Sequence, residues 1–258
     1  MRSSKRRRVG ARVKRGTRAV GVCLVVGLFG YASGTVAGVG TIGHLTALGY
    51  GTRTVEEIGL TVGFNVVGAG GTALSYMIIR RRGFDRRFVA DFLRVRWPTV
   101  WDVAWVVAGL VGAFVVMIGF EAVVDLLEPF GGSDGTTHSG IEEGRTYPAL
   151  FLVRIPIAVL LTGPGEELLF RGVLQSRLEE TFPTVVAVGL AALVFGCIHL
   201  PVYMGEEIGA VVVSIGTVTT LGLFFGILYE ASDTLLVPAL VHGCFNATVY
   251  LVNYLSYA

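Results

Sequence analysis

Residues 184–200 read TVVAVGLAALVFGCIHL, a run without any acidic residue, lysine or arginine. A helix that crosses a bilayer needs about 17–25 mostly apolar residues, because it must span a hydrocarbon core of about 30 Å. Other apolar runs predict spans over residues 19–43, 58–79, 102–127, 147–180, 208–230 and 234–255. The sequence therefore predicts seven membrane-spanning helices, or eight if the fourth run breaks in two.

The composition supports a membrane protein. Hydrophobic residues make up 53% of the chain, charged residues 16%, and the mean hydropathy is +0.68. Soluble domains contain roughly 25% charged residues. Only helices and closed barrels satisfy backbone groups in lipid, and these runs are too long for barrel strands. The predicted fold is an all-α, polytopic transmembrane helix bundle, in which the glycines of 34–40 and 68–71 form packing seams.

Lysine and arginine are unevenly distributed. Nine of the 21 lie in residues 1–18, and seven more lie in residues 80–97. Positively charged segments stay on the cytoplasmic side of a membrane, and these two are separated by two predicted spans. We therefore expect a multi-pass protein of the cell membrane with a cytoplasmic N-terminus and with residues 128–146 on the opposite side. We interpret the first basic run as an orientation signal, with no nucleic-acid partner.

Four polar side chains lie within the later apolar runs, namely Glu166, His199, His242 and Asn246. Charge at membrane depth costs several kcal/mol, roughly 3 on insertion scales, so it usually persists there for function. Helical rise places Glu166 and His199 both roughly 25 Å from the turn that joins their spans. His242 and Asn246 share a helix face and lie about 14 and 20 Å from the turn before the last span. We expect the four side chains to meet in one buried layer.

The two adjacent glutamates differ in their expected roles. Glu167 and Arg171 stand four residues apart with the acid first, the favoured order for a helical ion pair. Glu167 is therefore expected to clamp the helix through Arg171, which leaves Glu166 unpaired and free to act as a base. Gly163-Pro164-Gly165 directly precedes them, so we expect the helix to break there and to restart near Pro164.

Three motifs follow one another in successive spans: Glu-Glu-x-x-x-Arg at 166–171, Phe-x-x-x-His at 195–199 and His-x-x-x-Asn at 242–246. In this order they resemble the CPBP intramembrane proteases, the group of type II CAAX prenyl endopeptidases, bacteriocin-processing and immunity proteins, and lysostaphin-resistance-like proteins. The resemblance covers about residues 147–255. It implies an endopeptidase that acts, within the lipid bilayer, on a membrane-associated protein or peptide, with prenylated CAAX proteins as one candidate substrate.

The resemblance also implies a division of the chain and a role for each site residue. Residues 1–18 would be a basic cytoplasmic segment, 19–146 N-terminal transmembrane helices, and 147–255 the protease core, within one integral membrane domain. Glu166 and His199 would activate the hydrolytic water, and His242 and Asn246 would stabilise the oxyanion. A base and an oxyanion donor are worth about 10²–10⁴ and 10²–10³ in rate. Phe195 is expected to pack so that it orients the imidazole of His199.

A zinc ion is the one cofactor that the sequence leaves open. The family has also been called metalloproteases, and Glu166, His199 and His242 could form a His₂Glu site with an open position. No His-Glu-x-x-His motif is present, and the chain can also be read without any cofactor. Both alternatives stand at this stage.

Two other functions compete with proteolysis. The same fold could serve as a non-catalytic scaffold or immunity protein, and buried carboxylates and histidines could form the proton relay of a transporter, although no inverted repeat is evident.

Other polar residues are expected to be structural. Glu121, Asp125 and Arg154 should snorkel from span ends, and His44 and His138 carry no functional signal. The odd number of cysteines indicates no disulfide framework: Cys23, Cys197 and Cys244.

Overall fold

The computed structural model describes residues 2–127 and 139–258, in which helices form and no strand does. Seven helical stretches of this part of the chain are long and apolar enough to cross a membrane. They are formed by α1 (Arg2–Ala47); α2 (Arg53–Val62), η1 (Gly63–Gly71) and α3 (Thr72–Arg81); α5 (Val100–Leu127); α7 (Ala149–Ile157), η3 (Ala158–Thr162), α8 (Gly163–Glu167), η4 (Leu168–Gln175) and α9 (Ser176–Glu179); α10 (Thr184–Ile198) with η5 (Leu200–Tyr203); α11 (Ile208–Ser232); and α12 (Leu236–Tyr257). The short helices α4 (Arg86–Phe92) and α6 (Ser139–Thr146) lie between spans. The predicted all-α polytopic bundle is confirmed. It has seven candidate spans in the described residues, the lower of the two predicted numbers.

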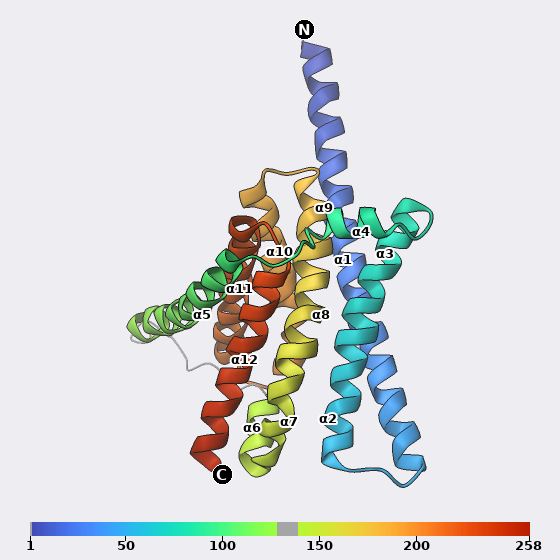
Figure 1. Ribbon diagram of the computed structural model, residues 1–258. Helices are drawn as coiled ribbons and strands as arrows, with labels where there is room; N and C mark the ends of the chain where they lie inside the picture. The colour runs from blue at the N-terminus through green and yellow to red at the C-terminus, as the bar shows by residue number, and fades with distance from the viewer. Residues whose placement is uncertain (1, 128–138) are drawn as a thin grey trace.

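The helices of the spans stand side by side, with α5 inclined away from the others (Figure 1). The N-terminal end of α1 lies at the same end of the bundle as α4 and α9, whereas α6 and the C-terminus lie at the other end. The two arginine-rich segments, 1–18 and 80–97, therefore share one end of the bundle. This is what an even number of crossings between them requires.

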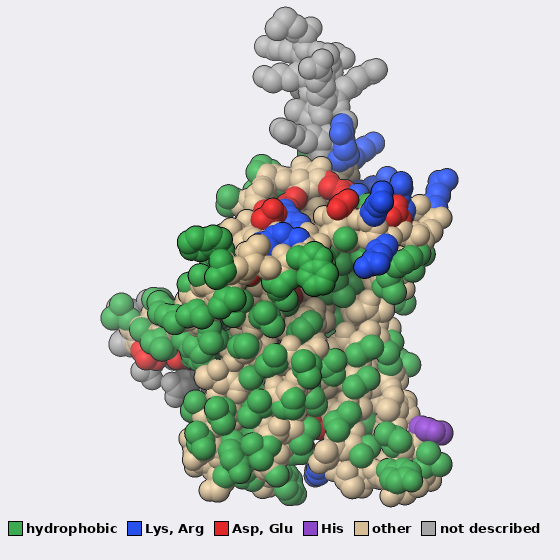
Figure 2. Space-filling view, viewed as in Figure 1, with side chains coloured by type: hydrophobic (Ala, Val, Ile, Leu, Met, Phe, Trp, Pro, Cys, Tyr) green, Lys and Arg blue, Asp and Glu red, His purple; other side chains and the backbone are tan. Residues whose placement is uncertain are grey.

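The surface matches a lipid environment. Figure 2 shows hydrophobic side chains over the middle of the molecule, while lysine and arginine gather at the end that carries α4. On α5, Val103, Val107, Val111 and Val115 repeat every four residues and are each 60–63% exposed. Soluble monomers rarely expose a continuous apolar stripe of this kind. The chain is an integral membrane protein.

The expected glycine seams are present between α1 and η1. A side chain added at Gly63 would place its Cβ 2.4 Å from the nitrogen of Gly38, and one added at Gly68 would lie 2.6 Å from the carbonyl oxygen of Gly30. The backbones of the first two spans therefore touch, which only glycine permits. This contact fixes how α1 and η1 border the cavity described below.

The predicted break in the fourth span is wrong. Thr162, Gly163 and Leu168 all have right-handed helical dihedral angles, so the chain continues through Pro164 in one direction. Two π-helical segments, η3 and η4, flank this point. A proline removes one backbone hydrogen bond and crowds the preceding turn, and the wider π turns accommodate it without ending the helix. The span remains continuous from α7 to α9.

Glycines also seat the fourth span against α12. A Cβ on Gly163 would lie 2.4 Å from the carbonyl oxygen of Ala239, and one on Gly243 would lie 2.8 Å from the carbonyl oxygen of Ala158. The two helices therefore cross in backbone contact beside Glu166 and His242. This crossing brings the third sequence motif within reach of the first.

Orientation in the membrane is a prediction that rests on the arginine-rich segments. In a variant without native cysteines, an impermeant thiol reagent should label Ser133→Cys in intact cells, because residues 128–146 are expected outside. Ser133 itself lies outside the described residues. Protection in intact cells, with labelling only after lysis, would reverse the predicted orientation.

Candidate active site

A cavity of about 1040 Å³ lies within the bundle and is bordered by residues of all seven spans. Glu166, His199, His242 and Asn246 all line it, as does Phe195. The structure thus brings together four polar residues that come from three different spans. The four residues meet because they lie at similar depths along their spans.

Glu166 lies between the two histidines. Its Oε2 atom is 3.9 Å from Nε2 of His199 and 4.0 Å from Nε2 of His242. Both distances exceed those of a direct hydrogen bond. The same oxygen is buried and has no hydrogen-bond partner in the described part of the chain. As predicted, Glu166 is not held in a structural ion pair with Arg171.

His199 has a defined tautomer. Its Nδ1 atom is 2.7 Å from the carbonyl oxygen of Phe195, and a carbonyl can only accept a hydrogen bond. Nδ1 therefore carries the proton, and in the neutral ring Nε2 presents its lone pair toward Glu166. The Phe195 ring packs on the imidazole with a centroid separation of 4.7 Å, which confirms the expected packing role.

Glu167 does more than the sequence indicated. Its Oε1 atom accepts a 2.7 Å hydrogen bond from Nη1 of Arg171, and both side chains are almost fully buried, so the predicted ion pair is confirmed. The same oxygen lies 2.8 Å from Nδ1 of His242. Glu167 therefore orients His242 across two spans and directs its Nε2 toward Glu166. The prediction that Glu167 only pairs with Arg171 within its helix is therefore incomplete.

Residues of α11 complete the surroundings and were missed in the sequence. Nη2 of Arg171 donates a 2.7 Å hydrogen bond to the carbonyl oxygen of Gly222. A Cβ on Gly222 would lie 2.8 Å from the ring of Phe195, so only glycine fits there. Phe225 stacks on His242 at a centroid separation of 4.8 Å. Spacing along the chain contains no signal for these contacts, because they depend on how α11 is rotated.

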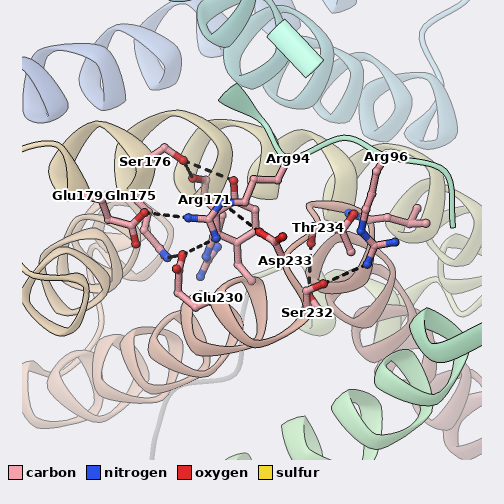
Figure 3. Close-up of polar contacts among 12 residues, drawn as sticks. Arg94, Arg96, Arg171, Gln175, Ser176, Glu179, Glu230, Ser232, Asp233 and Thr234 are labelled. Carbon is pink, nitrogen blue, oxygen red and sulfur yellow. Dashed lines mark hydrogen bonds and ion pairs between the residues drawn. The ribbon is translucent and has the colours of Figure 1, made fainter. Parts of the chain in front are cut away.

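Polar contacts continue along the same face of the fourth span toward the end that carries α4 (Figure 3). Nε2 of Gln175, which is fully buried, donates to the carbonyl oxygen of Gly226 at 3.3 Å and to Glu230 at 2.9 Å. Arg94 then donates to Glu230 and to Glu179, each at 3.1 Å. Burial alone would lower the pKa of Arg94. The neighbouring Tyr229 and the two carboxylates outweigh the effect of burial, and the pKa of Arg94 is raised above the ordinary arginine value. These contacts hold the register between the fourth span and α11.

Arg154 does not snorkel to the membrane surface, contrary to the prediction. It is 3% exposed, and its Nη2 atom donates to Glu57 at 2.6 Å and to Glu143 at 3.2 Å. The two carboxylates compensate a charge that would otherwise be costly inside the bundle. Glu121 and Asp125, also expected to snorkel, line the cavity from α5.

The remaining polar residues of the sequence analysis lie away from this constellation. His44 is in the last turn of α1 and does not line the cavity, and His138 lies outside the described residues. All three cysteines are free, and Cys197 is exposed.

A second, narrower groove borders the cavity. It has a volume of about 280 Å³ and is lined mainly by apolar side chains of α1 and α10, among them Leu24, Leu28 and Leu193. Tyr31 and Ile198 line both the groove and the cavity. The groove therefore adjoins the cavity near His199.

The zinc alternative finds no support in the arrangement of the side chains. Among the described residues, no group of three or more His, Cys, Asp and Glu side chains is placed to hold a metal ion.

Residues 148–248 match a protein-family model described as type II CAAX prenyl endopeptidase Rce1-like. The matched residues include Glu166, His199, His242 and Asn246. Comparisons with curated proteins and with solved structures find no match.

Proposed function

Because residues 148–248 belong to the type II CAAX prenyl endopeptidase Rce1-like family, we propose that this integral membrane protein is an intramembrane endopeptidase that hydrolyses a peptide bond of a membrane-associated, CAAX-type protein. The observation that carries the proposal is the buried Oε2 atom of Glu166, which faces Nε2 of both His199 and His242 and has no hydrogen-bond partner among the residues that the structure describes. A carboxylate oxygen in that position is suited to act as a base.

Glu166 and His199 are the groups that activate water in this proposal. Contacts of 3.9 Å and 4.0 Å leave room for one water molecule that hydrogen bonds to Glu166 and to a histidine nitrogen. The lone pair on Nε2 of His199 accepts a hydrogen bond from that water, and the carboxylate of Glu166 removes the water's other proton as the water oxygen attacks the scissile carbonyl carbon. Glu166 then passes this proton to the departing amide nitrogen. A positioned general base contributes about 10²–10⁴ in rate.

His242 and Asn246 stabilise the oxyanion. Nδ1 of His242 is engaged by Glu167, so Nε2 can donate a hydrogen bond at the same time only from the protonated imidazolium. The side-chain amide of Asn246, one helical turn further along α12, supplies a second donor. Donors of this kind act where negative charge develops in the transition state.

The apolar groove supports a substrate that carries a hydrocarbon substituent. Leu24, Leu28 and Leu193 offer a hydrocarbon chain an apolar surface, and Tyr31 and Ile198 connect that surface to the cavity. A prenylated cysteine close to the scissile bond fits this arrangement. Residues 147–255 then form the protease core, 19–146 supply helices that complete the cavity, and 1–18 form the basic segment on the cytoplasmic side of the cell membrane.

Purified protein in lipid vesicles should cleave a farnesylated CAAX-type reporter peptide and release one defined product, measured by mass spectrometry. Cleavage should survive exhaustive chelation, because the proposed water activation uses Glu166 and His199 alone. Loss of cleavage on chelation, with recovery on adding zinc, would overturn the metal-free mechanism. Absence of cleavage would favour the scaffold alternative for this substrate class.

A further inference from the structure

Tyr250 continues the polar face of α12 beyond the proposed oxyanion donors. It follows His242 and Asn246 at the same spacing of four residues, so the three side chains project from one side of the helix. All three line the cavity. Tyr250 is therefore placed where a peptide bound at Glu166 would continue along α12.

The hydroxyl of Tyr250 has no hydrogen bond to the part of the chain that the structure describes, and the residue shares the cavity lining with charged side chains. Arg154, Glu57 and Glu166 all act on it electrostatically. Tyr250 is half-buried and lines the cavity, so its hydroxyl is accessible to a ligand there. A tyrosine hydroxyl both donates and accepts hydrogen bonds, so it is suited to bind a polar group that enters the cavity.

Packing fixes the position of the Tyr250 ring. The ring stacks on Phe151 with a centroid separation of 6.2 Å and an interplanar angle of 28°. Phe151 is fully buried, and a Cβ on Gly144 would lie 2.4 Å from its ring. The hydroxyl is therefore presented to the cavity by a ring with little freedom to turn away.

Charge around the hydroxyl indicates what it binds. Arg154 is already engaged by both Glu57 and Glu143, so this group of three side chains carries a net charge of −1. A carboxylate ligand would be repelled there, whereas a neutral carbonyl oxygen can accept the phenolic hydrogen bond. Tyr250 lies about one helical turn, roughly 6 Å, beyond Asn246, and an extended peptide advances about 3.3 Å per residue.

From these observations we infer that Tyr250 is a further substrate-binding residue, whose hydroxyl donates a hydrogen bond to a main-chain carbonyl oxygen about two residues from the scissile bond. The inference rests on the proposed endopeptidase function. It adds a contact that lies outside the three sequence motifs and that grips the peptide backbone, so it does not depend on the identity of the substrate side chains.

The test compares Tyr250→Phe with Tyr254→Phe, which removes the same hydroxyl one turn further along α12, where the residue does not line the cavity. With the farnesylated reporter peptide, Tyr250→Phe should raise KM about fivefold to tenfold, as expected for one lost hydrogen bond, and leave kcat unchanged. Tyr254→Phe should change neither constant. The unfolding temperature of Tyr250→Phe in detergent should equal or exceed that of the wild type, because no internal hydrogen bond is lost. Reporters with a free and with an amidated C-terminus should show the same increase in KM, because the acceptor is an internal carbonyl.

Unchanged KM in Tyr250→Phe would overturn the inference, as would an increase confined to the reporter with a free carboxylate. An unfolding temperature lowered more than in Tyr254→Phe would also overturn it, since it would show that the hydroxyl bonds within the protein. If the wild type releases no product, the proposed function fails for this substrate, and binding of the reporter decides the inference separately. Binding that Tyr250→Phe weakens would support it, and equal or absent binding in wild type and variant would overturn it.

Discussion

Glu166→Gln should lower the cleavage rate by about 10²–10⁴ while leaving the amount of folded protein unchanged. Glutamine preserves the size of the side chain but cannot take a proton from water at neutral pH. The buried Oε2 atom of Glu166 has no hydrogen-bond partner in the described chain, so its replacement breaks no structural contact there. The measurement is the initial rate of reporter cleavage by protein in vesicles, alongside the unfolding temperature in detergent.

Two further variants sharpen this result. Glu121→Gln makes the same chemical change in another carboxylate of the cavity, on α5, and should leave the rate nearly unaltered. Asn246→Ala should lower the rate by roughly 10²–10³ through the loss of an oxyanion donor. Full activity in Glu166→Gln would rule out Glu166 as the general base, and unchanged biological function in both Glu166→Gln and Asn246→Ala would favour a non-catalytic scaffold.

Breaking the buried ion pair should instead reduce stability. Glu167→Gln leaves the buried guanidinium of Arg171 without its carboxylate, and Arg171→Met leaves the buried carboxylate of Glu167 without its guanidinium. Each variant should lose about 3–5 kcal/mol in the free energy of unfolding. The double variant Glu167→Gln/Arg171→Met should lose much less than the sum, since neither charge then remains. Denaturant unfolding of the three variants and the wild type in detergent measures the four free energies.

Activity separates the two roles of Glu167. The double variant should recover stability but not cleavage, because His242 still lacks the carboxylate that bonds its Nδ1 atom at 2.8 Å in the wild type. Recovery of cleavage together with stability would mean that Glu167 acts only as a clamp. A loss below about 1 kcal/mol in each single variant would contradict the burial of the pair, because such values are typical of exposed ion pairs.

The membrane fold could be predicted from sequence because its signals are local. Each span requires only a sufficiently long apolar run, and all seven predicted runs correspond to helices of the structure that are long enough to cross a membrane. The Glu167–Arg171 pair is equally local, since four residues along a helix place two side chains on one face. The meeting of Glu166 with His199 followed from counting helical rise from a shared turn.

Errors arose where a local rule competed with packing. Pro164 ordinarily ends a helix, yet the π-helical segments on both sides and the close seat of Gly163 on α12 keep the span continuous. Arg154 lies where a long side chain usually reaches for water, but Glu57 from α2 and Glu143 from α6 meet it inside the bundle. Both outcomes depend on residues distant in the chain.

The sequence by itself determined the class of fold, the number of spans within one, the buried ion pair and the four polar residues of the candidate site. Only the tertiary structure decided that Glu167 also holds His242, that α11 supplies a carbonyl to Arg171 and a ring to His242, and that Tyr250 lines the same cavity. The physical reason is that helix period and rise are properties of the chain itself. The rotation and crossing of one helix against another are set by the packing of both, and a single sequence does not display them.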